Sequence, residues 1–353
     1  MIPWQDVGGN RKDTSVASSI EDVAKLAGVS VSTASRAMNG HSRISAATIQ
    51  RVGEAARQIG YVPSSSAYTL ATGRNRNIGL VLPYVERWYF NSLLAGVESR
   101  LITAGYDLTL YNFNGSPEQR SAIFNDFLLR RRVDALITAS IKLEPDELTR
   151  LRQVDKPVLA IGDPFDGAYT LGIDNFGAAK LATDHLISLG HHRIGIIGGD
   201  PESETDFRHP ETRHKGYLAA MRDHSLAAPD EWFHPTDFTI AGGYAAAKNA
   251  LSDPRLELTA LFAASDEMAI GAILAARDLG MRVPDDVSIV GIDGHDLAEF
   301  FGLTTVAQAP NEQGARAAEI VLQMIQDHDR ELTNEQWRIE LIVRSSTSRR
   351  SLS

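Results

Sequence analysis

The segment Ile20–Asn39, IEDVAKLAGVSVSTASRAMN, carries side chains that suit the recognition of nucleic-acid bases. The small residues Ala24 and Ala34 allow two helices to approach closely, and Gly28 between them permits a left-handed turn. The second helix of this pattern exposes Val31, Ser32, Ser35 and Arg36. Two hydroxyls, a methyl-bearing side chain and a guanidinium match the donors, acceptors and methyl groups on base edges in a major groove. The spacing indicates a helix-turn-helix, although a plain three-helix bundle can share it.

Three aspartates follow short apolar segments that are typical of buried strands. They are Asp163, Asp174 in GIDN and Asp293 in VGIDG. In parallel α/β folds ligands bind beyond the carboxyl ends of strands, where carboxylates accept hydrogen bonds from ligand hydroxyls. Carboxylates at such positions also cap helices and turns, so both interpretations of Asp163 and Asp293 stay open.

No arrangement of residues predicts catalysis. The chain has no cysteine, which excludes disulfides, thiolate metal sites and cysteine nucleophiles. The glycines at 195, 198 and 199 do not form G-x-G-x-x-G, and no Walker loop, H-E-x-x-H or G-x-S-x-G occurs. The pair His191-His192 lacks a second pair of ligands at useful spacing and is interpreted as a surface turn. The sequence therefore predicts a protein that is not an enzyme and has no cofactor or metal.

The charge of the chain is unevenly distributed. Of 353 residues, 35 are Lys or Arg and 45 are Asp or Glu, a net charge of -10. Residues 19–77 hold seven basic and three acidic side chains, a net charge of +4. A small basic segment attached to an acidic remainder suits a nucleic-acid-binding head. No apolar run spans a membrane, and no apolar stretch follows the first charges as in a secretory signal, so a cytoplasmic protein is expected.

Local signals predict how the residues of the first motif are positioned. Residues 1–18 are polar and are expected to form a disordered arm. Ser19, Ser30 and Ser45 are expected to cap three successive helices, and Gly28 and Gly60 to end the first and third. Residues 63–76 contain a proline and three serines and predict a linker with one short helix, which is too short to be stable alone.

From residue 77 onward short apolar strands alternate with amphipathic helices. The strands are expected at 78–83, 107–112, 135–140, 157–162, 193–198, 259–264 and 287–292. The helices are expected at 91–104, 117–131, 175–189, 211–224, 241–251, 267–279 and 311–328. This alternation predicts parallel sheets with helices on both faces.

The segment Ile20–Leu70 resembles the head of the lactose-repressor/galactose-repressor (LacI/GalR) family. The resemblance rests on DVAKLAGVSVSTASR at 22–36, Asn39, Ile44-Ser45, Thr48, GYVP at 60–63 and AYTL at 67–70. It implies that Val31, Ser32 and Arg36 meet base edges. It further implies that phosphates or the loop are held by Ser30, Ser35, Asn39, Ser45 and Thr48. Ala67 and Leu70 would belong to a hinge helix that forms on DNA, with Leu70 inserted at the centre of the operator.

The remainder resembles the type I periplasmic-binding-protein core that this family carries, as far as ELIVRSST at 340–347. The expected fold is an all-α helix-turn-helix head (19–62), a hinge (63–76) and a two-lobed α/β core for effector binding and dimerisation (77–348), with a tail at 349–353. Lobe 1 would comprise 77–174 and 308–336, and lobe 2 175–306 and 337–348. Crossings are expected near 173–176, 305–309 and 335–338.

The resemblance also implies an effector site in the cleft between the lobes. Its residues would be Tyr89, Phe90, Asp163, Asp174, Arg213, Phe238, Ser265, Asp266, Asp293 and Gln308. Asp266 equally suits a cap of the following helix. Carboxylates, an arginine and aromatic rings suit a polyol, so a sugar or sugar derivative is favoured, with a nucleobase or another metabolite as the alternative. The charged stretch 200–213 departs from the family, and its Arg208 and His209 either reach the ligand or are solvated.

These observations predict a DNA-binding transcription regulator, most simply a repressor, that binds a palindromic operator as a homodimer under control of a small effector. No heptad follows Thr347, so a coiled-coil tetramer is not expected. Activation in place of repression stays open. A solute-binding module for transport would share the core but needs export and no DNA head. An enzyme on the same scaffold would need a catalytic motif.

Overall fold

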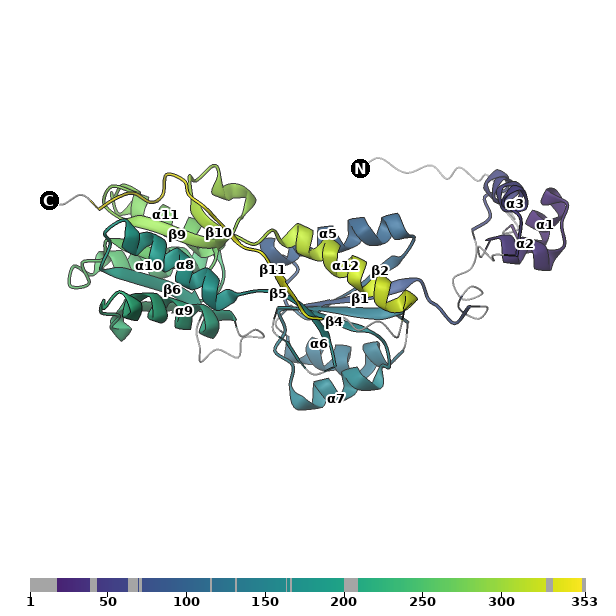
Figure 1. The fold of residues 1–353 in the computed structure, drawn as a ribbon, viewed down its shortest axis with the longest axis horizontal. Helices are drawn as coiled ribbons and strands as arrows, with labels where there is room; N and C mark the ends of the chain where they lie inside the picture. Colours follow the sequence, from purple (N-terminus) through teal and green to yellow (C-terminus); the bar gives the residue numbers. More distant parts are fainter. Residues whose placement is uncertain are drawn as a thin grey trace, which may run out of the picture. The chain divides into compact units, whose positions relative to one another are not determined.

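The computed structural model describes residues 18–38, 43–62, 69, 72–114, 116–130, 132–162, 164–165, 167–199, 209–327 and 333–350. The chain forms two compact units, Met1–Asn75 and Arg76–Ser353, which we call the head and the body. Figure 1 labels most of the helices and strands of the two units.

The described part of the head is helical, with α1 (Ile20–Ala27), α2 (Val31–Met38) and α3 (Ala46–Gln58). Their contact faces meet in one apolar core formed by Val23, Ala24, Ala27, Ala34, Ala37, Val52, Ala55 and Ala56. Most of these side chains are alanine, which lets three short helices pack closely. A helix-turn-helix, as predicted, results.

Capping residues set the ends of these helices. The Ser19 side chain accepts a hydrogen bond from the backbone N–H of Asp22, whose carboxylate accepts one from the N–H of Ser19. Gly28 ends α1 with φ 65°, a left-handed conformation that costs a residue with a Cβ more than it costs glycine. The turn between α1 and α2 therefore depends on this glycine.

The body contains two six-stranded sheets. The first sheet has the order β11-β5-β4-β3-β1-β2, and the second has the order β12-β10-β9-β8-β6-β7. The strands of the first are β1 (Asn77–Leu82), β2 (Asp107–Asn112), β3 (Ala135–Ala139), β4 (Val158–Ile161), β5 (Tyr169–Ile173) and β11 (Glu335–Trp337). Those of the second are β6 (Ile194–Gly199), β7 (Phe233–Thr236), β8 (Ala260–Ala263), β9 (Ser288–Asp293), β10 (Thr304–Ala307) and β12 (Glu340–Ile342). Neighbouring strands are parallel, except that β12 runs antiparallel to β10.

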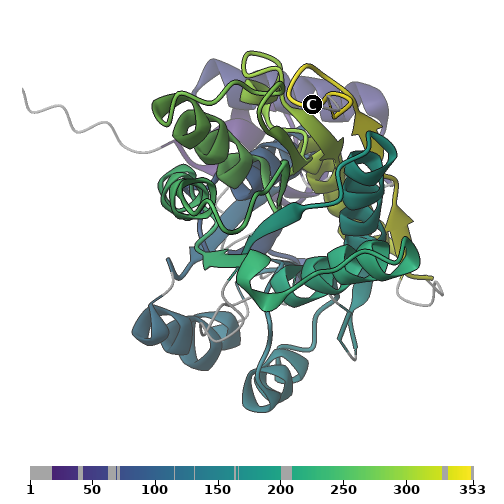
Figure 2. The same cartoon turned by 90° about the vertical axis from the view of Figure 1, so that its left-hand side faces the viewer.

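Helices cover both faces of each sheet. In the first lobe, α5 (Trp88–Ala104) and α12 (Pro310–Gln326) pack on one face, and α6 (Pro117–Ala122) and α7 (Pro145–Gln153) lie on the other (Figure 1). The α6 helix continues as a π turn (Ile123–Phe127) and a 3-10 turn (Leu128–Arg130). The second lobe holds α8 (Asn175–Ser188), α9 (His209–Asp223), α10 (Ile240–Ser252) and α11 (Asp266–Asp278), with 3-10 turns at Asp230–Trp232 and Asp296–Ala298. Figure 2 looks toward this lobe and shows helices on both sides of its sheet.

Three connections join the lobes in the described part of the body. They lie between β5 and α8, between β10 and α12, and between β11 and β12. Each lobe is consequently built from segments that are far apart in the sequence. The arrangement confirms the predicted fold class of a helix-turn-helix followed by a two-lobed parallel α/β body.

Several elements differ from the sequence-based expectation. The helix α7 and the strands β5, β7, β10, β11 and β12 were not among the predicted elements, and the helix expected at 117–131 is broken after Ala122. In α7, the sequence PDELTRLRQ buries only Glu147 and Leu151, so it carries little apolar periodicity. No helix in the described ranges is long and apolar enough to cross a membrane.

Candidate functional site

The exposed face of α2 presents the side chains predicted to contact bases. Val31 is 43% exposed, and Ser32 and Arg36 are also exposed, whereas Ser35 is half-buried. The Arg36 guanidinium donates to the Ser32 carbonyl (3.0 Å) and to its hydroxyl (3.3 Å). The Arg36 side chain therefore lies along the surface of α2, next to the Ser32 hydroxyl.

Hydroxyls also gather at the first turns of α2 and α3. The Ser30 hydroxyl accepts from the N–H of Thr33 (3.2 Å), and the Ser45 hydroxyl accepts from the N–H of Thr48 (3.3 Å). Helix N-termini carry partial positive charge and bind phosphate groups, which agrees with the phosphate contacts predicted there. The other predicted DNA contacts, Asn39, Ala67 and Leu70, lie outside the described residues.

A pocket of about 620 Å³, including the part that is open to solvent, lies in the body. Residues from both lobes line it, and many of them follow the carboxyl end of a strand. The lining consists of Arg87, Tyr89, Phe90, Ser140, Gly162, Gly172, Ile173, Asn175, Arg213, Phe238, Ser265, Glu267, Asp293, Gln308 and Gln313. This position matches the ligand site expected for open parallel sheets.

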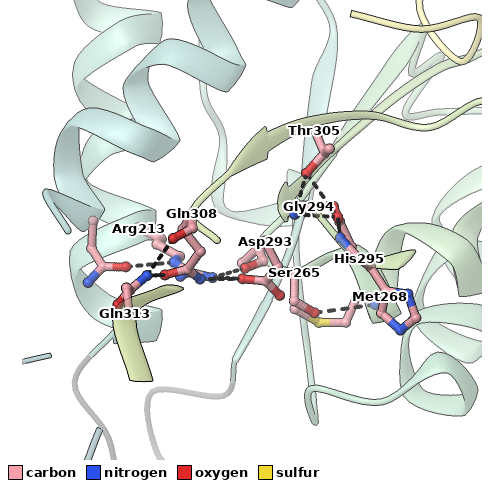
Figure 3. A network of polar contacts seen from close by, with 12 residues as sticks. Arg213, Ser265, Met268, Asp293, Gly294, His295, Thr305, Gln308 and Gln313 are labelled. Atoms are coloured by element: carbon pink, nitrogen blue, oxygen red, sulfur yellow. Dashed lines mark hydrogen bonds and ion pairs between the residues drawn. The ribbon is translucent and has the colours of Figure 1, made fainter. Parts of the chain in front are cut away.

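Arg213 of α9 lies at the centre of a polar network in the pocket (Figure 3). The side chain is 5% exposed, donates to Asn175 Oδ1 (2.9 Å) and to the Ala264 carbonyl, and lies 3.8 Å from Asp293 Oδ1. The Gln308 side chain donates to the same Asp293 oxygen (2.6 Å), and the backbone carbonyl of Gln308 accepts from the Gln313 side chain (2.6 Å). A buried guanidinium and carboxylate are thus each fixed by further hydrogen bonds, as a desolvated charge pair requires.

Asp293 ends β9 in an unusual backbone conformation, with φ 137°. Burial raises the pKa of its carboxyl to about 6, although Arg213 and the Gln308 amide oppose this shift. The turn after it is held by Asp266, whose Oδ2 accepts from the N–H groups of Gly294 (2.9 Å) and His295 (2.8 Å). The Thr305 hydroxyl donates to the same oxygen (2.9 Å). The turn therefore aims the Asp293 carboxylate into the pocket.

Aromatic rings form the apolar walls. Tyr89 and Phe90, at the start of α5, meet edge to face with ring centroids 5.1 Å apart, and Phe238 contributes from the second lobe. Burial raises the pKa of the Tyr89 hydroxyl to about 12, against a hydrogen bond with Ser140 that lowers it. Tyr89 is therefore a neutral donor and acceptor at any physiological pH.

The lobes also touch beside the pocket. The Trp88 indole stacks on the His295 ring, with centroids 4.5 Å apart, and donates from Nε1 to Asp296 (3.0 Å). Trp88 precedes the pocket residues Tyr89 and Phe90, while His295 follows Asp293. The contact thus joins the two lobes beside the pocket.

The structure brings together seven of the predicted effector residues. Those lining the pocket are Tyr89, Phe90, Arg213, Phe238, Ser265, Asp293 and Gln308. Asp174 is exposed and caps α8, accepting from the N–H of Gly177 (2.8 Å), and the fully buried Asp266 supports the turn after Asp293 from behind. Neither lines the pocket. Asp163, Arg208 and the His209 side chain lie outside the described residues.

Eight lining residues were not predicted: Arg87, Ser140, Gly162, Gly172, Ile173, Asn175, Glu267 and Gln313. The rule that ligands meet the carboxyl ends of strands would have found Ser140 after β3 and Asn175 after β5. Glu267 directly follows Asp266, but no spacing rule distinguishes which of two adjacent carboxylates faces a cleft. Among the described residues, no cluster of His, Asp and Glu has the geometry of a metal site.

Comparisons with known proteins give matches in both units. The family profile described as bacterial regulatory proteins, lacI family, matches residues 19–64, and that of a periplasmic binding protein-like domain matches residues 183–347. The chain is 33% identical over 310 residues to the HTH-type transcriptional repressor PurR of Actinobacillus pleuropneumoniae serotype 3, covering 87% of this chain and 90% of the relative. It is 34% identical over 335 residues to PurR of Haemophilus influenzae (strain PittEE), covering 93% of this chain and 98% of the relative.

Solved structures match the fold. A complex of the transcriptional regulator CelR with cellobiose is 28% identical with a TM-score of 0.69, covering 93% of this chain and 99% of the other. A LacI family regulator from Enterococcus faecium with bound ribose is 26% identical with a TM-score of 0.69, covering 77% of this chain and 99% of the other. The lac repressor dimer bound to operator and an anti-inducer is 24% identical with a TM-score of 0.79, covering 94% and 99%, and supports the fold alone.

Proposed function

Because this chain belongs to the lacI family of bacterial regulatory proteins, we propose that it acts as a dimer on a palindromic operator and that a small polyhydroxylated effector controls its binding. The chain is a transcriptional repressor of this family, like the relatives that match it over nearly their whole length, and not an enzyme. Base contacts by α2 and an effector in the pocket are the two parts of the proposal.

The single observation that carries the DNA-binding part is the exposed face of α2, with Val31, Ser32 and Arg36 available to a major groove. The hydroxyls at the first turns of α2 and α3 supply phosphate contacts on either side. The net charge of +4 over residues 19–77 adds the electrostatic attraction that such contacts require. Two copies would read two half-sites of one operator.

The polar network around Asp293 carries the effector part. Its carboxylate accepts from ligand hydroxyls, and the amides of Gln308 and Asn175 and the guanidinium of Arg213 supply both donors and acceptors nearby. Aromatic walls cover the apolar faces of a sugar ring. The similar regulators CelR, in complex with cellobiose, and that of Enterococcus faecium, with bound ribose, support a sugar or sugar derivative.

A purine is the second candidate, because the relatives that match most of the chain are named PurR. The rings of Tyr89, Phe90 and Phe238 also suit a flat heteroaromatic base. The charged groups of the pocket favour the sugar, since hydroxyls satisfy several carboxylate and amide acceptors at once, whereas a nucleobase presents few donors.

A thermal-shift screen followed by calorimetry tests both candidates. Cellobiose, ribose, glucose, hypoxanthine and guanine are the probes, because only a ligand of the folded body raises its melting temperature. We expect a sugar to bind and to change the affinity for an operator selected from random DNA. Asp293→Ala should keep operator binding and lose the effector response. If only purines bind, the effector is a purine and not a sugar. A full effector response in Asp293→Ala would contradict the assignment of the pocket as the effector site.

A further inference from the structure

Glu267 differs from the other polar residues of the pocket. It is the second residue of α11, lines the pocket and is half-buried. Asp293, Ser265 and Gln308 are all hydrogen-bonded within the protein. Within the part of the chain that the structure describes, the Glu267 carboxylate has no hydrogen bond or ion pair. A partly desolvated carboxylate in a pocket without a partner lacks a donor that a ligand can supply.

The charges around Glu267 are mostly negative. Burial is the main cause that raises the pKa of its carboxyl to about 7, followed by the negative charges of Asp293, Asp237 and Glu86, while Arg87 lowers it. The guanidinium of Arg87 lies over the Tyr84 ring, 4.3 Å from its centroid. Three further carboxylates and one arginine therefore act on the charge of Glu267, and of these Asp293 and Arg87 also line the pocket.

The second cation of the pocket is already engaged. Arg213 donates to Asn175 and to the Ala264 carbonyl and faces Asp293. Burial lowers its pKa, against the charges of Asp293, Tyr89 and Asp266, which raise it. A phosphate in this pocket would need a cation to neutralise it, but the Arg213 guanidinium is committed to the protein and that of Arg87 lies over the Tyr84 ring.

We propose that Glu267 is a ligand-contacting residue that determines the charge class of the effector. It accepts a hydrogen bond from a hydroxyl or amine of the ligand and excludes anionic ligands such as sugar phosphates, sugar acids and nucleotides. This inference rests on the proposed function of the pocket and specifies its ligand further: neutral or amine-bearing, with a donor at the end that faces α11. A phosphate group carries nearly two negative charges at neutral pH and would meet the carboxylates of Glu267 and Asp293, which line the same pocket.

A panel of paired probes tests the proposal on the full-length protein. The pairs are glucose with glucose 6-phosphate and glucuronate, ribose with ribose 5-phosphate, cellobiose with cellobionate, and hypoxanthine with inosine monophosphate. Dissociation constants are measured by calorimetry for each member that raises the melting temperature. We expect the neutral member of the binding pair to bind at least about tenfold more tightly than its anionic counterpart, since about 1.4 kcal/mol of repulsion suffices for that ratio.

The variant Glu267→Gln keeps the size of the side chain and removes its charge. It should weaken binding of the neutral probe about tenfold and bring the ratio between neutral and anionic probes close to one. Glu267→Asp should restore part of the discrimination. Glu231→Gln, at an exposed site outside the pocket, is the matched control and should leave both constants unchanged. Melting curves of each variant without ligand show whether it is folded.

The outcomes separate the inference from the proposed function. An anionic probe that binds as tightly as its neutral counterpart overturns the role of Glu267 and leaves an effector pocket in place. The same holds if Glu267→Gln changes neither the affinity nor the ratio. If hypoxanthine is the only neutral probe that binds, a sugar effector is ruled out. The ratio of the dissociation constants of hypoxanthine and inosine monophosphate then still tests the charge class of the ligand. If no probe binds, the proposed effector class fails and the inference fails with it.

Discussion

At the scale of single residues, Arg36 tests whether the exposed face of α2 recognises sequence. Arg36→Ala should weaken binding to an operator selected from random DNA by roughly 1–3 kcal/mol, if the guanidinium makes a bidentate base contact. Binding to unrelated DNA should weaken far less. Competitive gel-shift titration at fixed salt measures both. Arg57→Ala, which removes an exposed basic side chain from α3, is the charge-matched control, and an equal loss on both DNAs in Arg36→Ala would contradict base recognition.

Glu267 also predicts how the stability of the body depends on pH. The folded state raises the pKa of its carboxyl from an ordinary value near 4.5 to about 7. The native state therefore binds more protons than the unfolded state between these values, so this residue contributes stability at low pH that is lost as the pH rises toward 7. Glu267→Gln should be more stable than the wild type at pH 8, by roughly 1 kcal/mol after allowance for solvent screening, and equal to it near pH 5.

Differential scanning calorimetry of the two proteins from pH 5 to pH 8 checks this prediction. The buried His191 and the half-buried His234 have pKa values lowered mainly by burial, and they titrate in both proteins, so their effect cancels in the difference. Glu231→Gln provides a control for the loss of an exposed carboxylate. A difference between wild type and Glu267→Gln that stays constant with pH would contradict the assigned burial of this group.

Sequence reasoning identified many of the pocket residues but not their individual roles. Of the predicted aspartates, Asp293 lines the pocket, whereas Asp174 caps α8 and Asp266 faces the turn after β9. Spacing along the chain fixes the end of the sheet at which a residue lies. It does not fix the rotamer or the neighbour that satisfies a carboxylate, because these depend on contacts such as that of Asp266 with Thr305, 39 residues away.

At the scale of elements, the turn between α1 and α2 depends on Gly28. Its φ of 65° costs an alanine roughly 1–2 kcal/mol, so Gly28→Ala should destabilise the head by this amount and lower operator affinity. Gly53→Ala is the matched control, because Gly53 lies inside α3 and an added Cβ would meet only Arg57, at 3.6 Å. That change should be neutral or stabilising by about 0.5–1 kcal/mol.

Thermal unfolding followed by circular dichroism measures both variants, and the transition of the body serves as an internal reference. If Gly28→Ala and Gly53→Ala had the same effect on the head, the left-handed turn would not be the cause.

The elements themselves were predictable where a strong local pattern coincided with burial. The strand β9 and the helix α11 have apolar patterns that match their burial, and both were expected within one residue of their bounds. Strands β11 and β12 are three residues each and lie at sheet edges. They form because they pair with a strand that is distant in the sequence, and their own residues show no strong strand pattern. The polar helix α7 was missed because it buries only Glu147 and Leu151 and so carries little apolar periodicity.

At the scale of the whole molecule, a palindromic operator requires two heads. We expect sedimentation velocity at micromolar concentration to show a dimer, and DNase footprinting to show two half-sites about one helical turn apart. A monomer that binds one half-site with full affinity would contradict this prediction, and so would a stable tetramer.

The three connections between the lobes have a consequence for the order in which the protein is made. The head is one continuous segment, whereas the sheet of the first lobe gains its edge strand β11 only at Glu335–Trp337 and that of the second gains β12 only at Glu340–Ile342. A ribosome adds about 5–20 residues per second, so β5 waits on the order of 10 s for the strand that pairs with it. During that time a newly made chain has a finished DNA-binding unit attached to two incomplete sheets, each with an open edge. Translation itself thus separates the moment at which this protein can first touch DNA from the later moment at which it can first respond to an effector.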